Sequence, residues 1–275
     1  MGTALTEAIL NAGYTTTIWN RTAEKAEKFL VKGAKLGASA IDTVQASPLV
    51  VACVLNYEAL FNIIKQIGSA MTDKVWVNLN TGTPEDARKA ASIITEFGAK
   101  YIDGAIMDIP QSIGKPETLI FYSGNEKAFK LYQSTLMTLG GRSIFLGSDA
   151  GLSKLYELGV GSTLVPTLLG FLQGAALVGT ANIKAEKLAP YTTEWLNMAI
   201  SLLPKIAKEI DTKSYKTDIA SLNVFTGISH DIKAYEEAGI KSDVLHPMKA
   251  LIDRGVSLGY GSDSISRLIE LIKNP

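Results

Sequence analysis

Two patterns of apolar and polar residues alternate along the first half of the chain. Short apolar runs typical of strands cover residues 15–19, 48–56 and 74–80. The second and third runs are almost continuous, as expected for strands that are covered on both faces. Segments with helical periodicity lie between the runs, and they begin at Thr22 and Thr83, both residues that cap helices well. Strands separated by helices predict a mostly parallel α/β sheet.

Further short strands are expected at residues 100–106, 118–124 and 143–147, and after Gly147 the strand signals stop. Residues 151–180 are expected to form one long helix, and residues 188–210 a second helix with a break at Pro204. Amphipathic helices follow at residues 229–240 and 264–274. The chain is therefore divided into an α/β domain (1–147), an interdomain helix (148–180) and an all-α domain (181–275).

One uncharged segment raises the question of a membrane span. Residues 158–183 carry no charged side chain, and a helix of this length is long enough to cross a bilayer. Several glycines, Pro166, Gln173 and Asn182 interrupt the segment, and no basic cluster at one end sets an orientation. We interpret it as a helix buried on all sides inside the protein.

Composition narrows the class of protein. Lys+Arg and Asp+Glu are 27 each, so no basic field attracts nucleic acid or an anionic membrane. Cys53 is the only cysteine, and His230 and His246 are the only histidines, which argues against a disulfide, a zinc site or any other metal site. No signal peptide is recognisable at the start, so a reduced, cytoplasmic protein is expected.

The first 22 residues indicate a cofactor site. A helix at residues 3–13, the strand at 15–19 and the turn Asn20, Arg21 and Thr22 form the second half of a dinucleotide-binding βαβ unit. Gly2 takes the place of the last glycine of a GxGxxG turn, beside the helix amides that hold the pyrophosphate. Asn20 and Arg21, with Lys25 one turn further, suit a 2′-phosphate and favour NADP over NAD. An ordinary solvated helix start is the alternative.

The first strand of this unit and the first two glycines of the turn are absent. That strand is central in a doubly wound sheet, so its loss is expected to expose two apolar strand edges. We therefore expect a truncated chain or a misassigned start, with about a dozen residues missing, one strand of about five or six plus the turn.

Several segments together resemble the β-hydroxyacid dehydrogenases, and more narrowly their imine reductase branch with its reductive aminases. The segments are MGTAL, WNRT, CVLNY, VNLNTGTP, DGAIMDIP, PETLIFYSG, GLSKLYELG, GFLQGAALVGT and KALIDRGVSLGYGSD. The resemblance implies an α/β Rossmann domain with its first strand missing, a long interdomain helix, and an all-α C-terminal domain that embraces a second subunit. It implies NADP as the cofactor and a homodimer with the active site at the dimer interface. The partner would then cover the outer face of the uncharged helix.

The same resemblance places Leu55, Asn56, Asn80 and Thr81 beside the cofactor, with Thr81 close to the nicotinamide or the substrate. The position of the proton-handling residue falls on Glu157. Glu157 is the last charge before the uncharged segment, where a desolvated carboxyl is biased toward its protonated form. It is expected to donate a proton or, when ionised, to attract an iminium cation. The alternative is that Glu157 is an ordinary glutamate at a solvent-exposed helix end without a catalytic role.

Two other functions stay open. An NADP-dependent β-hydroxyacid dehydrogenase would use a lysine on the interdomain helix followed by asparagines; Lys154 is a candidate, but Leu158 and Gly159 occupy the asparagine places, and we expect Lys154 to be exposed. The carboxylate-binding loop of that branch is also not preserved after Asp108. The third possibility is a catalytically impaired dimer that binds NADP or nothing. The favoured prediction is NADPH-dependent reduction of C=N bonds in a cyclic imine or a carbonyl–amine adduct.

Overall fold

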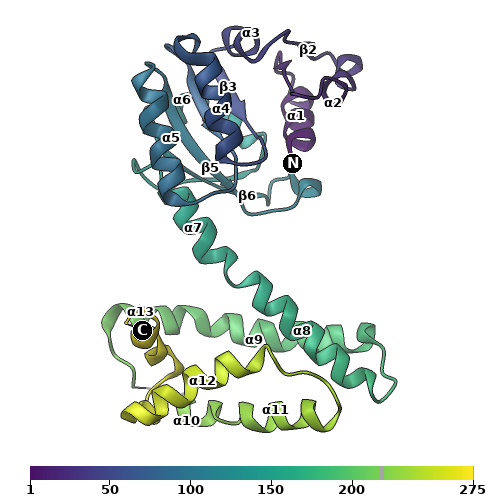
Figure 1. Ribbon diagram of the computed structural model, residues 1–275, viewed down its shortest axis with the longest axis vertical. Helices are drawn as coiled ribbons and strands as arrows, with labels where there is room; N and C mark the ends of the chain where they lie inside the picture. The colour runs from purple at the N-terminus through teal and green to yellow at the C-terminus, as the bar shows by residue number, and fades with distance from the viewer. Residues whose placement is uncertain (217–219, 275) are drawn as a thin grey trace. The chain divides into compact units, whose positions relative to one another are not determined.

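The computed structural model describes residues 1–216 and 220–274, and it divides into two units, Met1–Thr163 and Leu164–Pro275 (Figure 1). The first unit contains every strand of the sheets in the described residues, and the second contains helices. The expected order of an α/β part followed by a helical part is therefore present. The division at residues 147 and 180 stays a prediction.

A five-stranded sheet forms the centre of the first unit. Its strands, in spatial order, are β3 (Leu49–Ala52), β4 (Val75–Asn78), β5 (Lys100–Ile106), β6 (Leu119–Gly124) and β7 (Arg142–Phe145). All neighbours are parallel except β5 and β6, which are antiparallel. Only the short 3₁₀ turn η3 (Pro110–Ser112) lies between these two strands. Because a parallel pair needs a long crossover connection, this short link suits the antiparallel arrangement.

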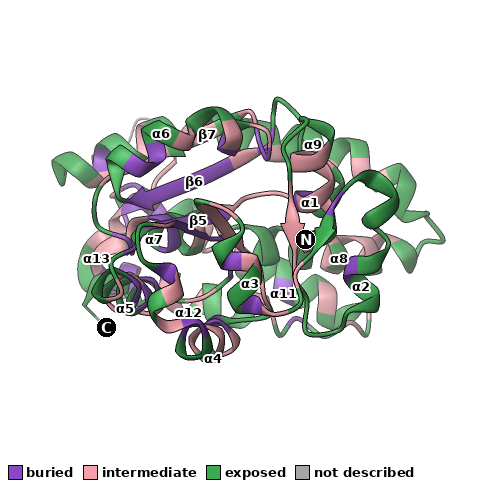
Figure 2. Ribbon diagram, turned by 90° about the horizontal axis from the view of Figure 1, so that it is seen from above, coloured by how far each residue is buried: buried purple, intermediate pink, exposed green. Residues whose placement is uncertain are grey.

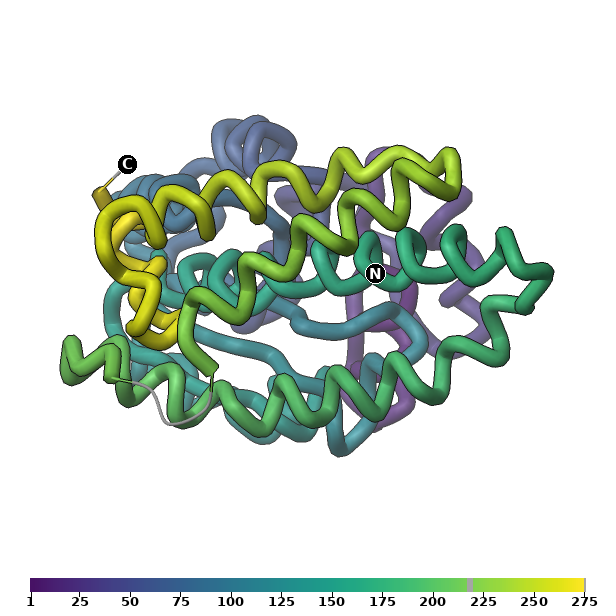
Figure 3. The backbone as a smooth tube through the Cα atoms, turned by 90° about the horizontal axis from the view of Figure 1, so that it is seen from below, coloured from purple at the N-terminus to yellow at the C-terminus, as the bar shows by residue number. Residues whose placement is uncertain are grey.

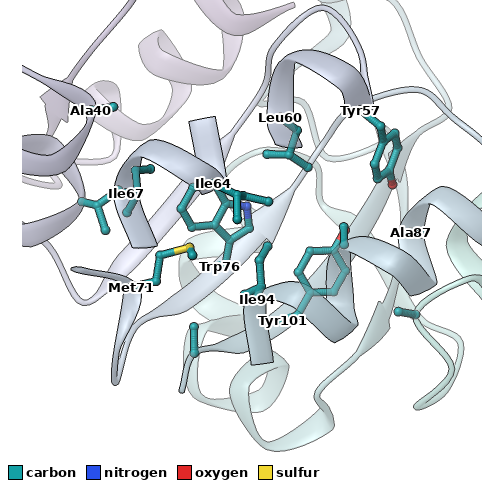
Figure 4. Packing of buried hydrophobic residues seen from close by; sticks show 14 residues of the cluster. Ala40, Tyr57, Leu60, Ile64, Ile67, Met71, Trp76, Ala87, Ile94 and Tyr101 are labelled. Atoms are coloured by element: carbon teal, nitrogen blue, oxygen red, sulfur yellow. The ribbon is translucent and has the colours of Figure 1, made fainter. Parts of the chain in front are cut away.

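Helices cover both faces of the sheet. On one face lie α3 (Ala40–Gln45), α4 (Tyr57–Ile67), η2 (Gly68–Met71) and α5 (Pro84–Glu96); on the other lie α1 (Gly2–Asn11) and α6 (Glu126–Met137). Figure 4 shows Trp76 of β4 packed among Ile64, Met71 and Ile94 on the first face. Val75 and Val77 of the same strand belong to the cluster of the second face. β4 is thus buried on both sides, and Figure 2 shows β5 and β6 buried as well.

The start of α5 follows the sequence prediction. Thr83 has extended backbone angles and its hydroxyl accepts from the amide of Asp86, while the Asp86 carboxylate accepts from the amide of Thr83. Pro84 occupies the first turn, where no amide donor is needed. A capping box of this kind satisfies two amides that the helix itself leaves without partners.

Two short strands stand apart from the main sheet. β1 (Thr17–Ile18) pairs in parallel with β2 (Lys35–Leu36), and neither strand pairs with β3 in the part of the chain that is described. A cavity of about 420 Å³ lies between β1 and β3, lined by Thr17 and Ile18 of β1 and by Leu49 to Ala52 of β3. The central strand of a doubly wound sheet would occupy this place, so the two expected open strand edges are present.

The helix expected to start at Thr22 is shorter than its periodicity suggests. The structure has α2 (Glu24–Glu27) with Ala23 as its N-cap, then the 3₁₀ turn η1 (Leu30–Lys32), and Gly33 ends the segment in the left-handed region at φ 87°. The Thr22 side chain does not cap this helix, whose N-cap is Ala23, and the Thr22 amide donates to the Asn20 side chain. Ala26 and Phe29 are buried in this segment, whereas Leu30 and Val31 are exposed at 47% and 91%, so only part of its apolar surface supports a longer helix.

The second unit is helical in its described residues. Its helices are α8 (Leu164–Gly179), α9 (Ala185–Thr212), α10 (Leu222–Phe225), α11 (Ile228–Glu237), α12 (Leu245–Gly255) and α13 (Ile269–Lys273), with a π-helical turn η4 (Val256–Tyr260) and a 3₁₀ turn η5 (Ile265–Leu268). Figure 3 shows the chain reversing direction between α8 and α9. Pro204 lies inside α9 without ending it, so the predicted break there is wrong.

The uncharged segment is not enclosed by this chain. By length and composition alone, the stretch Leu152–Gly179 is apolar enough to cross a membrane: an 18-residue window within it has a mean hydropathy of 1.4, and none of that window is buried in the structure. It contains two helices, α7 (Leu152–Gly161) and α8, rather than the one expected. The prediction of a helix buried on all sides is therefore wrong for the single chain, because α8 has no buried residue.

Candidate cofactor and active site

The predicted nucleotide end of the site lies directly after β1. The Asn20 side-chain oxygen accepts from the amide of Thr22 at 3.0 Å, which turns the chain out of the strand. Arg21 and Lys25 are exposed, and among the described residues neither forms an ion pair with a carboxylate. Two uncommitted cations at the end of this strand fit the 2′-phosphate of NADP.

The pyrophosphate end of the site is open. Helix α1 begins at Gly2 with Met1 as its N-cap, and no side chain caps its first amides. These amides are free to bind an anion, as at other helix starts. A Cβ added to Gly2 would meet only the carbonyl oxygen of Cys53 at 3.9 Å, an ordinary contact. The close strand contact that usually demands this glycine is therefore not made by the described chain.

The carboxyl ends of β3 and β4 are joined by an asparagine. Asn80 is 2% exposed, and its Oδ1 accepts from the amide of Val54 at 2.6 Å. Leu55 is exposed, and Asn56 caps α4 by accepting from the amide of Ala59 at 2.9 Å. The structure thus places the predicted cofactor residues of these strands at one edge of the sheet, and it gives Asn56 a structural task besides.

Asn80 also carries an unused donor. Its Nδ2 is buried and has no hydrogen-bond partner in the described chain. A buried amide without a partner costs about 1–3 kcal/mol, so a bound molecule that accepts from it would restore that energy. Together with the unpaired cations of Arg21 and Lys25, this donor without a partner is compatible with the binding of nicotinamide adenine dinucleotide phosphate (NADP).

A buried carboxylate organises the other side of the site. Asp103 of β5 is fully buried, and it accepts hydrogen bonds from four side chains: Tyr57 at 2.6 Å, Tyr101 at 2.5 Å, Asn78 at 2.9 Å and Ser153 at 2.8 Å. Burial first, and the Asp103 charge second, raise the pKa of Tyr57 and of Tyr101, so both phenols remain donors. This network joins β4, β5, α4 and α7.

Lys154 of α7 is part of the same network, and the prediction that it is exposed is wrong. The side chain is 1% exposed, and its Nζ donates to the carbonyl of Gly104 at 2.9 Å and to Glu157 Oε2 at 3.0 Å. Asp103 Oδ1 lies 3.4 Å from the same ammonium. A lysine is buried here because two carboxylates and a carbonyl replace its water.

Glu157, the predicted catalytic residue, lies at the outer edge of this cluster. Its side chain is 20% exposed, so it is accessible from solvent but not surrounded by it. The prediction started from a desolvated carboxyl biased toward its protonated form. The structure shows it as the acceptor of a buried ammonium instead, which favours the second of the two expected roles, binding a cation.

Thr81, the second predicted catalytic residue, is exposed on the loop after β4. A continuous set of contacts joins this loop to Glu157: Gly82 lies against the Tyr57 ring, Tyr57 binds Asp103, and Asp103 pairs with Lys154. These contacts connect the loop that carries Thr81 to the Asp103 cluster, and a shared role of Thr81 and Glu157 stays a prediction. Tyr156, the neighbour of Glu157, is 47% exposed and packs edge-on against Phe121, with ring centroids 5.5 Å apart.

The sequence reasoning missed Asp103 and its partners. An aspartate inside the apolar run of residues 100–106 was the available signal, since a buried strand tolerates an acid only when a cation or several donors satisfy it.

Asp108, at the lost carboxylate-binding loop, has its pKa lowered by the Ser112 hydroxyl and the Ile109 amide. No group of three or more metal-ligating side chains occurs within residues 1–216 and 220–274.

Comparison with known proteins agrees with this geometry. Residues 1–147 match the NAD binding domain of 6-phosphogluconate dehydrogenase, and residues 149–274 match the C-terminal domain of NADPH-dependent reductive aminase-like proteins. The NADPH-dependent reductive aminase of Aspergillus oryzae is 37% identical over 279 residues, which cover 99% of this chain and 94% of that enzyme.

Solved structures give the same result. The reductive aminase of Aspergillus terreus in complex with NADPH and ethyl levulinate has a TM-score of 0.94 and 33% identity, covering 99% of this chain and 95% of that one. An imine reductase of Streptomyces aurantiacus has a TM-score of 0.94 and 29% identity, covering 98% and 95%. Site and comparisons lead to one conclusion: the chain belongs to the family of NADPH-dependent reductive aminases and imine reductases.

Proposed function

We propose that this protein reduces C=N bonds with NADPH, acting on cyclic imines and on the adducts that amines form with carbonyl compounds. The observation that carries the proposal is the carboxylate of Glu157, which a buried ammonium holds at the edge of the site. Relatives with 37% and 33% identity are reductive aminases by name, and one is solved with a keto ester. A carbonyl compound and an amine are thus suitable substrates.

When bound, NADPH supplies the hydride for this reduction. Arg21 and Lys25 would hold its 2′-phosphate, the first amides of α1 its pyrophosphate, and Asn80 Nδ2 an acceptor atom at the carboxyl ends of the strands. Thr81 would bond the carboxamide or the substrate nitrogen with its hydroxyl. Glu157 would bind the substrate nitrogen through the oxygen that Lys154 leaves uncommitted.

The active site is proposed to be completed by a second copy of the chain. Large apolar side chains lie exposed on α8, among them Leu164, Val165, Leu168 and Leu172 at 53–60%. Exposed apolar area of this extent favours association. We expect a homodimer with interlocked helical domains, in a reducing, cytoplasmic environment that suits the free thiol of Cys53.

Light scattering tests the dimer. The wild-type protein is expected to have twice the mass of the chain, and Leu168→Glu is expected to shift it toward the monomer, because a charge replaces apolar area at the interface. Lys187→Glu, a change of an exposed polar residue, serves as the control. A wild-type monomer at micromolar concentration contradicts the proposal.

NADPH consumption with 2-methyl-1-pyrroline tests the reaction, beside a 3-hydroxy acid with NADP⁺. Turnover of the imine alone is expected, whereas turnover of the hydroxy acid alone would favour the hydroxyacid dehydrogenase. Glu157→Gln is expected to lower kcat/KM by about a hundredfold, because the amide keeps the shape but not the charge. Glu126→Gln, at an exposed glutamate of α6, is the matched control. Full imine turnover by Glu157→Gln would remove Glu157 from the mechanism.

A further inference from the structure

Three charged side chains meet where α7 packs on β5, and the function proposed above uses only one of them. Lys154 Nζ lies 3.0 Å from Glu157 Oε2 and 3.4 Å from Asp103 Oδ1. Lys154 and Asp103 are almost completely buried, and only Glu157 reaches solvent. Such a cluster needs a reason, since apolar side chains of the same volume usually stabilise a fold at least as well.

The three groups have unequal freedom. Asp103 accepts from four other side chains, and it is therefore held as an anion that cannot turn toward a substrate. Lys154 donates to Glu157 and to the carbonyl of Gly104, and its ammonium forms an ion pair with Asp103 Oδ1 at 3.4 Å, so its position is determined too. Glu157 is tied by Oε2 alone, and within the described chain its Oε1 has no hydrogen-bond partner.

The net charge of the Asp103–Lys154–Glu157 cluster is also divided unequally between its buried and its accessible groups. With one ammonium and two carboxylates, the cluster keeps a single net negative charge. Asp103 balances Lys154 inside the protein, and the remaining charge lies on Glu157 at the accessible edge. Without Asp103, the ammonium would cancel the charge of Glu157 and the site would no longer attract a cation.

We propose that Lys154 is a positioning residue for the reduction, that it aims the free oxygen of Glu157 at the substrate nitrogen, and that Asp103 preserves the negative charge of Glu157. This assignment rests on the proposed function and names its substrate class, a positively charged iminium ion. Such an ion brings its own proton on nitrogen. Hydride addition to its carbon breaks the π bond and leaves a neutral amine, so no proton has to leave Glu157.

Substitution of Lys154 by methionine separates positioning from attraction. Lys154→Met keeps the apolar stem, and the four side-chain donors to Asp103 still stabilise that carboxylate. With 2-methyl-1-pyrroline and saturating NADPH, kcat is expected to fall about 10- to 100-fold, because the carboxylate loses its orientation. KM is not expected to rise, because the site becomes more negative. Lys130→Met, at an exposed lysine of α6, is the control.

Substitution of Asp103 has the opposite signature. Asp103→Asn leaves Lys154 to neutralise Glu157, so KM is expected to rise about tenfold while kcat changes less. The double variant Asp103→Asn/Lys154→Met restores the net charge, so KM is expected to return toward the wild-type value while kcat stays low. A purely structural cluster would instead lower the melting temperature and leave kcat and KM of the folded protein unchanged.

Binding of the 2-methylpyrrolidinium cation, measured by calorimetry in the presence of NADP⁺, separates this proposal from the function on which it rests. If the wild-type protein does not reduce the imine, the proposed function fails. The charge assignment still holds if Asp103→Asn weakens binding of the cation about tenfold and the double variant restores it. A Lys154→Met protein with kcat within about twofold of wild type, or equal cation binding in all variants, overturns the inference. If Asp103→Asn does not fold, Lys154→Met alone decides.

Discussion

Gly82, next to the predicted catalytic Thr81, is expected to be irreplaceable for a steric reason. A Cβ built on Gly82 would lie 2.4 Å from both Cδ2 and Cε2 of the Tyr57 ring. Tyr57 is 4% exposed, and its hydroxyl is anchored to Asp103 at 2.6 Å. The ring therefore moves aside only by giving up the bond to the carboxylate, and otherwise the loop that carries Thr81 has to move.

The cost follows from these contacts. Overpacking in a core costs about 1–3 kcal/mol, and a lost hydrogen bond to a buried charge costs about 1.5–3 kcal/mol. If the ring moves and both losses occur, Gly82→Ala is expected to lower the free energy of unfolding by about 2.5–6 kcal/mol. Urea unfolding followed by circular dichroism measures this, with the m-value as a check on cooperativity. Gly159→Ala is the control, since a Cβ there meets nothing within 4 Å.

A double-variant cycle identifies the clash as the cause. In a Tyr57→Leu background the ring is gone, so adding the Cβ at Gly82 is expected to cost less than about 1 kcal/mol. A Gly82→Ala protein within about 0.5 kcal/mol of wild type would refute the reasoning. An equal cost in both backgrounds would also refute it, because the penalty would then not come from Tyr57.

Three further predictions follow from the first unit. Arg21→Ala is expected to weaken NADPH binding about tenfold or more and to leave NADH binding unchanged, measured by fluorescence titration; an equal loss for both cofactors would contradict a 2′-phosphate site. Arg88 donates to both carboxylate oxygens of Asp149 and, together with the Gly151 amide, lowers the pKa of Asp149. Because the pKa of Asp149 is lower in the folded protein than in the unfolded chain, the pair stabilises the fold above about pH 4, and this contribution is lost as the pH falls through the lowered pKa. Arg88→Met is therefore expected to be slightly less stable than wild type at pH 7, and the difference should shrink in acid. A difference that grows in acid would reverse this sign. Finally, an apolar strand of about five or six residues with a glycine-rich turn, fused before Met1, is expected to raise the melting temperature and tighten NADPH binding by filling the cavity between β1 and β3; no change in either would contradict the role given to that cavity.

Local sequence signals were sufficient to predict elements whose conformation depends little on tertiary contacts. The apolar run of β4 and the N-cap of α5 at Thr83 were predicted correctly, because covered strands and helix starts have signals within a few residues. The family was also recognisable from short segments, and a nucleotide-binding role of the turn after β1 stays a prediction. Signals of this kind failed at residues 22–33, where a short helix and a 3₁₀ turn replace most of the predicted helix.

The sequence by itself therefore determined the succession of an α/β part and a helical part, the family and the cofactor, while the role of Glu157 stays a prediction. Only the tertiary structure decided that Lys154 is buried, because its partner Asp103 lies 51 residues earlier in the chain and on another element. It likewise showed that α8 is exposed in the single chain and that β1 and β3 leave a cavity between them. The physical reason is the same in each case. Periodicity and capping are local, whereas the burial of a charge, a strand edge or an apolar helix depends on what packs against it.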